Sequence, residues 1–483
     1  MRITAIAMVL LLAGCNASHA TDASPPPRGR SAESALSARP SPRPPKPEFG
    51  LEAPASEPGL ALPTPDATQE PAVEAAADWQ LTRSGGIEGY ATRVSVLPGE
   101  RFYLRVSTAA PYFTATAFRM GGQVRRVWTS GRVRGLLQPR PRTISTTKRM
   151  ASAAHWKNSL IVSTSGWPEG AYLIRLDSPL GQRYVPVTVR SRSTRGKVVI
   201  LNAVTTWQAY NAWGGRSLYR GPGGYKDRSW AVTFDRPYDG TGARKFLLFE
   251  KDVIETAERS GVPLAYLTDL DLVPGALDGA RALVSLGHDE YWSPQMRQVV
   301  EQARDRGTNL AFLGANAVYW RIGLRGRVIE CDKKVRCRRW RDVGKPESSL
   351  VGQMYACYPA EGTYLVTQPR HWVFRGTTGT SFPGLAGHEV DTVMRGSPKN
   401  VQILAESPVR CNEKSAVAHT TYYVAPSGAG VFATGTLRWV CAMRGSLCGH
   451  GVTDEAADFT RQVTTNVLRR FSEGPVRDSR ADA

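Results

Sequence analysis

The sequence lacks an apolar run long enough to cross a bilayer. Residues 3–12 form a nearly uninterrupted apolar stretch of about ten residues, whereas a transmembrane helix needs about 20. No helix-turn-helix, zinc-finger or RNP-type motif is present, and no CxxC pair or nearby pair of histidines supplies zinc-ligand spacing. These absences argue against a transmembrane helix in the rest of the chain, a nucleic-acid-binding module and a structural zinc site.

Acidic residues are scarce relative to basic ones. The 483 residues include 42 Asp and Glu against 62 Lys and Arg, which gives a net charge of +20. Such a balance attracts polyanions, but without a nucleic-acid-binding motif we expect no nucleic-acid partner. An anionic membrane, glycan or outer-leaflet surface is one alternative. The other, which composition alone favours, is a solvated arginine-rich surface.

The first residues have the pattern of an export signal. Arg2 supplies a short positive region before the apolar run, and residues 12–15, Leu-Ala-Gly-Cys, resemble the lipobox of bacterial lipoproteins. We therefore expect a signal peptide over residues 1–14 and a lipid on Cys15. The alternative is an ordinary cleaved signal that ends in Ala-Ser-His-Ala at residues 17–20.

A lipid on Cys15 would place the protein in the cell envelope, anchored to a membrane and exposed to the periplasm or the exterior. Asn16 follows the cysteine, where an aspartate is the usual signal for retention in the inner membrane. We therefore expect the outer membrane.

The cysteines other than Cys15 all lie in the last third of the chain. Their even number and the expected oxidising compartment predict up to three disulfides. Two pairs are spaced closely enough to close one loop each, although the sequence leaves the connectivity open. The six cysteines are Cys331, Cys337, Cys357, Cys411, Cys441 and Cys448.

Composition and apolar periodicity divide the chain. Residues 15–77 are rich in Pro, Ala and Ser and are expected to be a disordered spacer, because they cannot bury enough apolar surface to fold. Short alternating runs separated by Gly and Pro predict a β-sandwich-like domain over residues 78–195, with an Arg-rich insertion at 120–158. Residues 475–483 are expected to be a disordered tail.

Residues 196–474 are predicted to form an α/β domain with a parallel sheet. Continuous apolar runs at 198–201, 264–268, 282–286 and 309–313 have the character of buried parallel strands. Helical periodicity alternates with them at 245–260, 272–280 and 293–306, and a closing helix is expected at 454–471. A cysteine-bearing insertion with β character is expected near 325–430.

Polar and aromatic residues follow three of these expected strands, in residues 205–215, 287–293 and 314–320. The carboxyl ends of parallel strands meet at one edge of a sheet, so these groups are expected to converge on an active site. His288, Asp289 and Glu290 are able to bind a metal or move protons. The alternatives are packing for the aromatic residues, a helix cap for Asp289 or Ser293, and a turn at Asn316.

The three segments together resemble a known family. Tyr-Asn-Ala-Trp-Gly-Gly at 210–215, Gly-His-Asp-Glu-Tyr-Trp-Ser at 287–293 and Phe-Leu-Gly-Ala-Asn at 312–316 resemble the C-terminal region of the N,N-dimethylformamidase large (beta) subunit and its relatives. The resemblance extends over roughly residues 80–472. It implies a β-sandwich-like domain joined to a glutamine-amidotransferase-like, flavodoxin-like α/β domain. It also implies a mononuclear ferric iron, held by two tyrosines and one glutamate, that hydrolyses a small amide.

The resemblance also implies roles for individual residues. Tyr210 and Glu290 would bind the iron, and Tyr172 is the candidate for the second tyrosine because it precedes Tyr210 by about the expected distance. His288 would be an acid, base or substrate-binding group, and Asn316 would line the pocket. Two further pocket members are expected at Glu389 and Lys333.

These expectations describe a membrane-tethered, iron-dependent hydrolase of a carbon–nitrogen bond in a small, non-peptide amide. Its expected partners are that substrate and the membrane, through the N-terminal lipid, with a homo-oligomer or a small partner subunit as further candidates. One alternative is a surface-displayed glycan or polyanion binding module with a non-catalytic site. Another is a hydrolase that uses the same site on a glycan or an ester.

Overall fold

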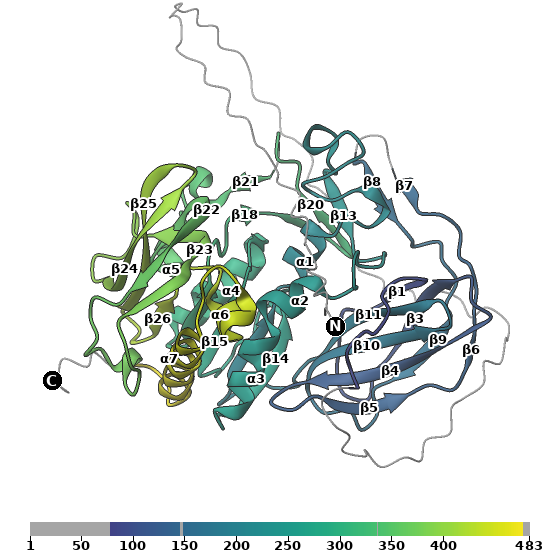
Figure 1. Cartoon of the computed structure of the whole chain (residues 1–483), viewed down its shortest axis with the longest axis horizontal. Helices are drawn as coiled ribbons and strands as arrows, with labels where there is room; N and C mark the ends of the chain where they lie inside the picture. Colours follow the sequence, from purple (N-terminus) through teal and green to yellow (C-terminus); the bar gives the residue numbers. More distant parts are fainter. Residues whose placement is uncertain (1–77, 145–147, 336, 477–483) are drawn as a thin grey trace, which may run out of the picture. The chain divides into compact units, whose positions relative to one another are not determined.

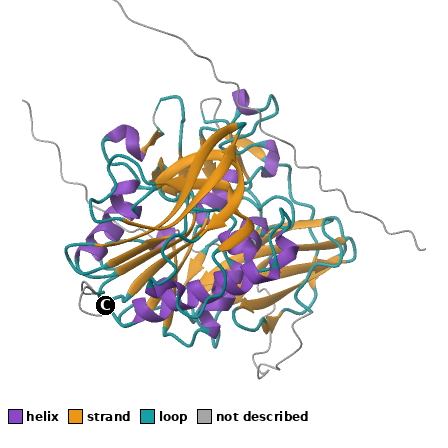
Figure 2. Cartoon of the chain, turned by 60° about the vertical axis from the view of Figure 1, so that its left-hand side comes forward, coloured by secondary structure: helices purple, strands orange, loops and turns teal. Residues whose placement is uncertain are grey.

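The structure is a computed structural model that describes residues 78–144, 148–335 and 337–476 (Figure 1). The expected signal peptide, Cys15, the expected spacer and residues 477–483 of the expected tail lie outside these ranges. Within them, no helix is both long enough and apolar enough to cross a membrane. Strands dominate the regular structure, and 21% of the described residues are helical (Figure 2).

The N-terminal part of the described chain contains two facing sheets, one with the strand order β1-β3-β9 and one with β2-β11-β10-β4-β5, where β6 also pairs with β4. In these sheets the β2–β11 pairing is parallel and the others are antiparallel. The strands are β1 (Ile87–Ala91), β2 (Ser95–Val96), β3 (Arg101–Thr108), β4 (Tyr112–Met120), β5 (Arg125–Thr129), β6 (Val133–Arg134), β9 (Leu160–Ser163), β10 (Gly170–Ser178) and β11 (Gly181–Val189).

The period of two along these strands builds the core between the sheets. In β3, Phe102, Leu104 and Val106 point inward and are buried, while the residues between them are more exposed. They pack in one apolar cluster with side chains of β4 and β10, such as Phe113 and Ile174. Complete burial of such a side chain stabilises the fold by about 1.5–3 kcal/mol.

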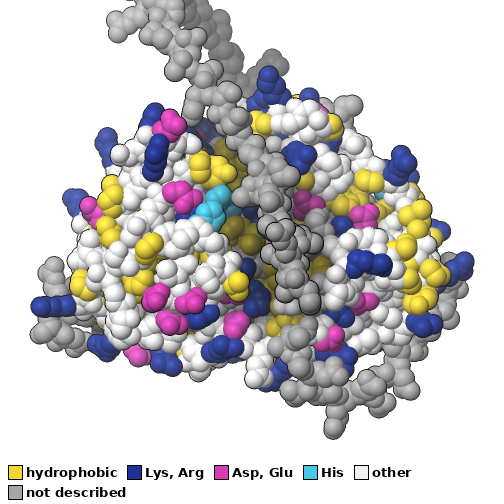
Figure 3. All heavy atoms as spheres, viewed as in Figure 1, with side chains coloured by type: hydrophobic (Ala, Val, Ile, Leu, Met, Phe, Trp, Pro, Cys, Tyr) yellow, Lys and Arg dark blue, Asp and Glu magenta, His cyan; other side chains and the backbone are white. Residues whose placement is uncertain are grey.

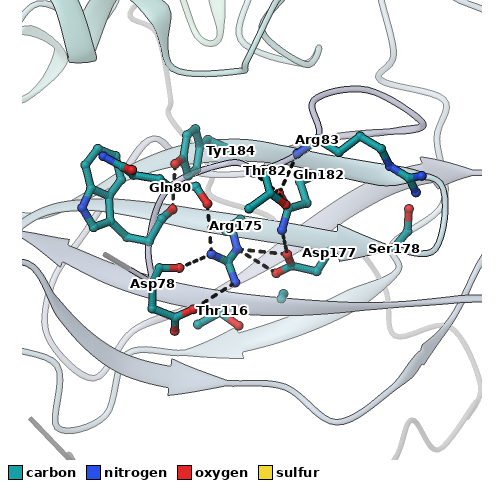
Figure 4. Close-up of polar contacts among 12 residues, drawn as sticks. Asp78, Gln80, Thr82, Arg83, Thr116, Arg175, Asp177, Ser178, Gln182 and Tyr184 are labelled. Atoms are coloured by element: carbon teal, nitrogen blue, oxygen red, sulfur yellow. Dashed lines mark hydrogen bonds and ion pairs between the residues drawn. The ribbon is translucent and has the colours of Figure 1, made fainter. Parts of the chain in front are cut away.

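The first described residues are held on the β10–β11 hairpin by polar contacts (Figure 4). The Arg175 guanidinium donates to the Asp78 carbonyl and pairs with Asp177 at 2.9 Å. The Gln182 side chain accepts from the Thr82 amide at 2.7 Å and donates to Asp177 at 2.5 Å. These contacts supply hydrogen-bond partners to the backbone of residues 78–83, which form almost no strand.

The C-terminal part is built on a nine-stranded sheet with the order β14-β12-β15-β17-β26-β25-β24-β22-β23. Five neighbouring strands run parallel to one another and are almost entirely buried. They are β12 (Val198–Asn202), β14 (Leu264–Thr268), β15 (Ala282–Gly287), β17 (Asn309–Gly314) and β26 (Gly430–Ala433).

The predicted fold class is wrong, because the sheet is mixed and the chain is β-rich rather than a parallel-sheet, flavodoxin-like α/β domain. The remaining four strands pair antiparallel and lengthen the sheet beyond β26. Buried and exposed residues alternate along β24, as in a sheet with one solvated face. These strands, which lie in the expected cysteine-bearing insertion, are β22 (Met354–Leu365), β23 (Ser381–Thr392), β24 (Gln402–Cys411) and β25 (Lys414–Val424).

The helices differ from expectation at two places. The expected helix 245–260 is divided at Glu250, whose φ of −136° interrupts it. No helix forms over 272–280, where Pro274-Gly275 starts a series of turns and Gly275 has a φ of 87°. The α-helices are α1 (Val204–Tyr210), α2 (Arg244–Phe249), α3 (Lys251–Arg259), α4 (Pro294–Asp305), α5 (Ser348–Val351), α6 (Trp439–Ala442) and α7 (Asp454–Ser472). The 3₁₀ helices are η1 (Trp213–Gly215), η2 (Tyr225–Asp227), η3 (Asp269–Asp271), η4 (Trp340–Val343), η5 (Trp372–Phe374) and η6 (Gly445–Cys448).

The cap of α4 is Ser293, one of the two helix caps that the sequence offered. The Ser293 hydroxyl accepts from the Met296 amide at 3.3 Å, and Pro294 occupies the first helical position.

Small sheets and disulfides complete the fold. The small sheets have the orders β13-β20-β19, β16-β18-β21 and β7-β8. Their strands are β7 (Arg142–Ile144), β8 (Met150–Ser152), β13 (Ala231–Thr233), β16 (Tyr291–Trp292), β18 (Trp320–Arg321), β19 (Gly323–Arg325), β20 (Val328–Glu330) and β21 (Arg338–Arg339). The predicted disulfides are confirmed as the pairs Cys331–Cys337, Cys357–Cys411 and Cys441–Cys448.

Candidate active site

Three loops at the carboxyl ends of β12, β15 and β17 carry the candidate residues. Tyr210 ends α1, which begins directly after β12, and Glu290 lies between β15 and β16. Gly287 turns the chain at the end of β15 with a φ of 51°, and a Cβ there would lie 2.4 Å from the Phe249 carbonyl oxygen. Asn316 follows β17 with a φ of 58°, which is in the left-handed region that asparagine tolerates. The backbone thus aims these side chains at one place.

Three tyrosines surround the Glu290 carboxylate. Tyr210 donates to Glu290 Oε2 at 2.7 Å, and Tyr219 donates to Oε1 at 2.8 Å. The Tyr210 and Tyr219 rings stack with centroids 4.4 Å apart, and their hydroxyls lie 3.1 Å from each other. Tyr291 donates to the Tyr219 hydroxyl at 2.6 Å. We call Tyr210, Tyr219, Tyr291 and Glu290 the tyrosine–glutamate cluster.

The structure does not bring Tyr172 to this cluster. It lies on β10 in the core of the sandwich, where its ring stacks on Trp167 and its hydroxyl donates to the Pro168 carbonyl at 2.6 Å. Tyr219 lies beside Tyr210, where the family resemblance implied Tyr172. Tyr219 lies between η1 and η2, in a segment without helical or strand periodicity. Its closeness to Tyr210 in the sequence was therefore the one signal that could have marked it as a site residue.

A second group lies against the cluster and includes three of the other candidates. The His288 Nε2 atom is 3.4 Å from a carboxylate oxygen of Glu290 and 3.4 Å from one of Glu389. The Asn316 side chain donates to Glu389 at 2.8 Å, and its backbone amide donates to Asp391 at 2.8 Å. These residues join β15, β17 and β23 at one point.

Several polar atoms of this site are buried and have no hydrogen-bond partner among the described residues. They are both ring nitrogens of His288, the Asn316 Oδ1 atom and the Lys333 Nζ atom. An unpaired buried polar atom costs about 1–3 kcal/mol, so such atoms are expected to meet a ligand, an ion or water. The site therefore has both donors and acceptors available to a bound molecule.

Two lysines stand over the rings of the cluster. The Lys333 Nζ atom is 3.3 Å from the centroid of Tyr219, and the Lys245 Nζ atom is 3.8 Å from that of Tyr210. Burial lowers the pKa of Lys333 to about 7 and that of Lys245 to about 8. Lys333 belongs to the short loop closed by the Cys331–Cys337 disulfide.

Burial governs the other titratable groups of the site. It raises the pKa values of Tyr210, Tyr219 and Tyr291 well above the ordinary value, and the Glu290 charge adds to that effect. Burial also raises the pKa of Asp391 to about 7. For Glu389, burial is outweighed by the charge of His288 and the Asn316 amide, so its pKa is lowered. Glu389 is thus ionised at neutral pH.

The oxygen atoms of the cluster are hard ligands of the kind that ferric iron prefers. Within the described residues, no group of three or more His, Cys, Asp or Glu is arranged to hold a metal. A metal at this site would therefore depend on tyrosine oxygens.

The sequence model of the family described as N,N-dimethylformamidase beta subunit-like, C-terminal, matches residues 114–454. This chain belongs to that family. The match includes the complete tyrosine–glutamate cluster together with His288, Asn316, Lys333 and Glu389. No curated protein matches the chain.

Three solved structures that are similar to this chain share little sequence with it. A putative ThuA-like protein from Bacteroides uniformis is 14% identical, with 58% of this chain and 93% of that chain covered and a TM-score of 0.31. One from Parabacteroides merdae is 10% identical, with 59% and 93% covered and a TM-score of 0.29. The mmIFT52 N-terminal domain is 11% identical, with 44% and 86% covered and a TM-score of 0.27. Similarity at this level supports no conclusion about fold or function.

Proposed function

We propose that this member of the N,N-dimethylformamidase beta subunit-like family hydrolyses a carbon–nitrogen bond in a small amide, with a ferric iron bound by Tyr210, Tyr219 and Glu290. The observation that carries the proposal is the convergence of two tyrosine hydroxyls on one buried carboxylate, at 2.7 and 2.8 Å. Burial of the Glu290 carboxylate costs desolvation free energy, and a bound cation would offset that cost. Tyr291 would position Tyr219, because the Tyr291 hydroxyl donates to the Tyr219 hydroxyl.

The donor set fits the proposed ion. Phenolate and carboxylate oxygens suit a hard trivalent cation, and the high pKa values of the free tyrosines mean that binding would displace their protons. When bound, iron supplies Lewis-acid polarisation of a carbonyl and a lowered pKa of coordinated water. The protein's part is to bind the substrate, exclude water and move protons.

His288 is the proposed proton carrier. Its Nε2 atom lies 3.4 Å from both the Glu290 and Glu389 carboxylates, so it would accept a proton from the attacking water and pass it to the leaving amine. Glu389 would keep the imidazole in place, and Asn316 in turn holds Glu389. The free Asn316 Oδ1 atom would accept a hydrogen bond from the substrate amide. The Lys333 amino group would donate one to it.

We also propose that the chain is tethered through a lipid on Cys15 in the cell envelope, with the outer membrane preferred. The three disulfides of the described residues support an oxidising compartment. The test is labelling of cells with a radioactive fatty acid. Label should appear on the wild-type chain and be absent from Cys15→Ser, and label that persists on Cys15→Ser would contradict the tether.

The test of function is amine release from a panel of small N-alkyl formamides and acetamides by the iron-loaded full chain. We expect His288→Ala to lose at least about a hundredfold in rate, the scale of general acid–base catalysis. His419→Ala is the matched control, because His419 lies on β25 and contacts none of the cluster residues. Glu290→Ala should lose both iron and activity.

Two results would contradict the proposal. One is amine release that is unchanged in Glu290→Ala, which would place the chemistry elsewhere. The other is an iron-loaded protein that releases no amine from any amide of the panel, which would favour a non-catalytic binding role.

A further inference from the structure

One stretch of the sandwich carries no acidic residue. Between Glu100 and Glu169 the sequence has no Asp or Glu but has 12 Lys and Arg residues. Some of these are neutralised by distant parts of the chain, as Arg119 is by Glu258. Four arginines between β5 and β8 are exposed and have no ion pair within the described part of the chain. They are Arg132, Arg134, Arg140 and Arg142.

The same stretch exposes aliphatic side chains. Leu137 is 70% exposed, Leu136 is 45% exposed and Ile144 is 43% exposed, which places all three among the most exposed large apolar residues of the described chain. Single exposed apolar residues are ordinary on protein surfaces, but adjacent ones flanked by arginines without an ion pair are not. We call residues 132–144 the Arg–Leu segment.

The Arg–Leu segment is held firmly on the sandwich. The Thr108 amide donates to the Leu136 carbonyl at 3.0 Å, and the Trp156 indole donates to the Pro139 carbonyl at 2.8 Å. Between them, the Gln138 side chain is buried and bonds the Lys157 backbone in both directions, at 2.8 and 3.1 Å. The leucines are therefore exposed on a fixed backbone.

Local alternation orients the charged and aliphatic side chains outward. Val133 packs against the sandwich core, so its neighbours Arg132 and Arg134 face away from it. Arg142 and Ile144 share one face of β7. Figure 3 shows apolar side chains beside Lys and Arg side chains at the edge of the sandwich near β6.

We propose that the Arg–Leu segment is a docking surface for an anionic lipid bilayer. Its arginines would bind lipid phosphates while Leu136 and Leu137 enter the boundary between head groups and acyl chains. A soluble polyanion would engage the arginines equally well but would gain nothing from the leucines. A merely solvated basic surface, which composition alone favours, accounts for neither the leucines nor the fixed backbone. The inference does not depend on the hydrolase activity.

The test is co-sedimentation of the full chain with vesicles. All proteins carry Cys15→Ser, so that an attached lipid cannot cause binding, and the vesicles contain either phosphatidylcholine alone or phosphatidylcholine with phosphatidylglycerol at 3:2. We expect binding to the anionic vesicles alone. Each arginine near such a surface contributes about fivefold in partitioning, so replacing all four by glutamine should weaken binding by roughly a hundredfold or more.

A matched control separates the segment from net charge. Four other exposed arginines have no ion pair among the described residues, and replacing them by glutamine removes the same charge. They are Arg370, Arg375, Arg395 and Arg410. This control variant should retain most of the binding, and an equal loss in both variants would overturn the proposal.

The leucines distinguish a bilayer from a soluble polyanion. Leu136→Ser with Leu137→Ser keeps every charge, and we expect it to weaken vesicle binding by about tenfold because apolar burial is lost. The retention of this double variant on a heparin column should be the same as that of the unsubstituted protein. Vesicle binding that is unaffected by this double substitution would identify the segment as a purely electrostatic polyanion site and would overturn the bilayer assignment.

Discussion

Lys333 offers a test of the site that needs neither iron nor substrate. Its amino group is buried over the Tyr219 ring, and burial lowers its pKa from 10.5 to about 7. Each pKa unit corresponds to about 1.4 kcal/mol, so at pH 7 and below the buried ammonium costs the folded state at most about 5 kcal/mol. Lys333→Met keeps the length of the side chain and removes the charge, and it should stabilise the iron-free protein.

The stability difference between the wild type and Lys333→Met should depend on pH. Between pH 7 and pH 10.5 the unfolded chain binds the lysine proton while the folded chain does not, so the stability of the wild type rises with pH through that window. The stabilisation by Lys333→Met should therefore be larger at pH 6.5 than at pH 9, by about 2.5 kcal/mol. Other titrating groups, such as Lys245 and Asp391, contribute equally to both proteins and cancel in the difference.

Urea unfolding of the iron-free full chain, followed by tryptophan fluorescence at pH 6.5 and pH 9, measures the effect. Lys334→Met is the matched control, because Lys334 lies in the same disulfide loop but is exposed. It should change stability by no more than about 0.5 kcal/mol at either pH. A Lys333→Met variant that is destabilised, or whose stability difference from the wild type does not change with pH, would refute the assigned burial of this ammonium.

Two further predictions concern the loop and the contact between the sandwich and α3. Replacing both cysteines of the Cys331–Cys337 loop by serine should release Lys333 and increase its acylation by an amine reagent, as mapped by mass spectrometry. The same change at the Cys441–Cys448 pair should leave Lys333 protected, and equal labelling in both variants would show that the loop does not position it. Glu258→Gln should destabilise the fold by about 2 kcal/mol in thermal unfolding, because it leaves the partly buried Arg119 without its carboxylate. Since the pKa of Glu258 is lowered in the fold, the wild type should lose this advantage as the pH falls below about 4.5, and a difference that persists there would contradict the ion pair.

Part of the fold could be predicted because its signal is local. The continuous apolar runs at 198–201, 264–268, 282–286 and 309–313 correspond to β12, β14, β15 and β17, since a strand buried on both faces has no polar side to show. Among the strands between residues 354 and 424, β24 has a local signal of its own, an alternation of buried and exposed residues. The attachment of these strands to the same sheet depends on pairings between residues far apart in the sequence, such as Thr421 with Ala433 next to β17, and no periodicity reveals these.

The candidate site also has residues that could be predicted from the sequence and residues that could not. Tyr210, His288, Glu290 and Asn316 lie in segments that follow parallel strands. Sheet geometry grouped these segments, the family resemblance singled out the residues, and the structure brings them together. Tyr219 was missed because it lies in an irregular segment whose path is set by contacts of the folded chain. Tyr172 was chosen for its distance in sequence, but its position on a sandwich strand buries it in a different core.

The visible absorption spectrum of the iron-loaded protein is the sharpest test of the proposal that Tyr210, Tyr219 and Glu290 bind ferric iron. Tyrosinate bound to ferric iron gives an intense charge-transfer band. We expect this band in the wild type and in Tyr172→Phe, and a weaker, shifted band with less bound iron in Tyr219→Phe. A spectrum that is unchanged in Tyr219→Phe, or lost in Tyr172→Phe, would contradict the proposal.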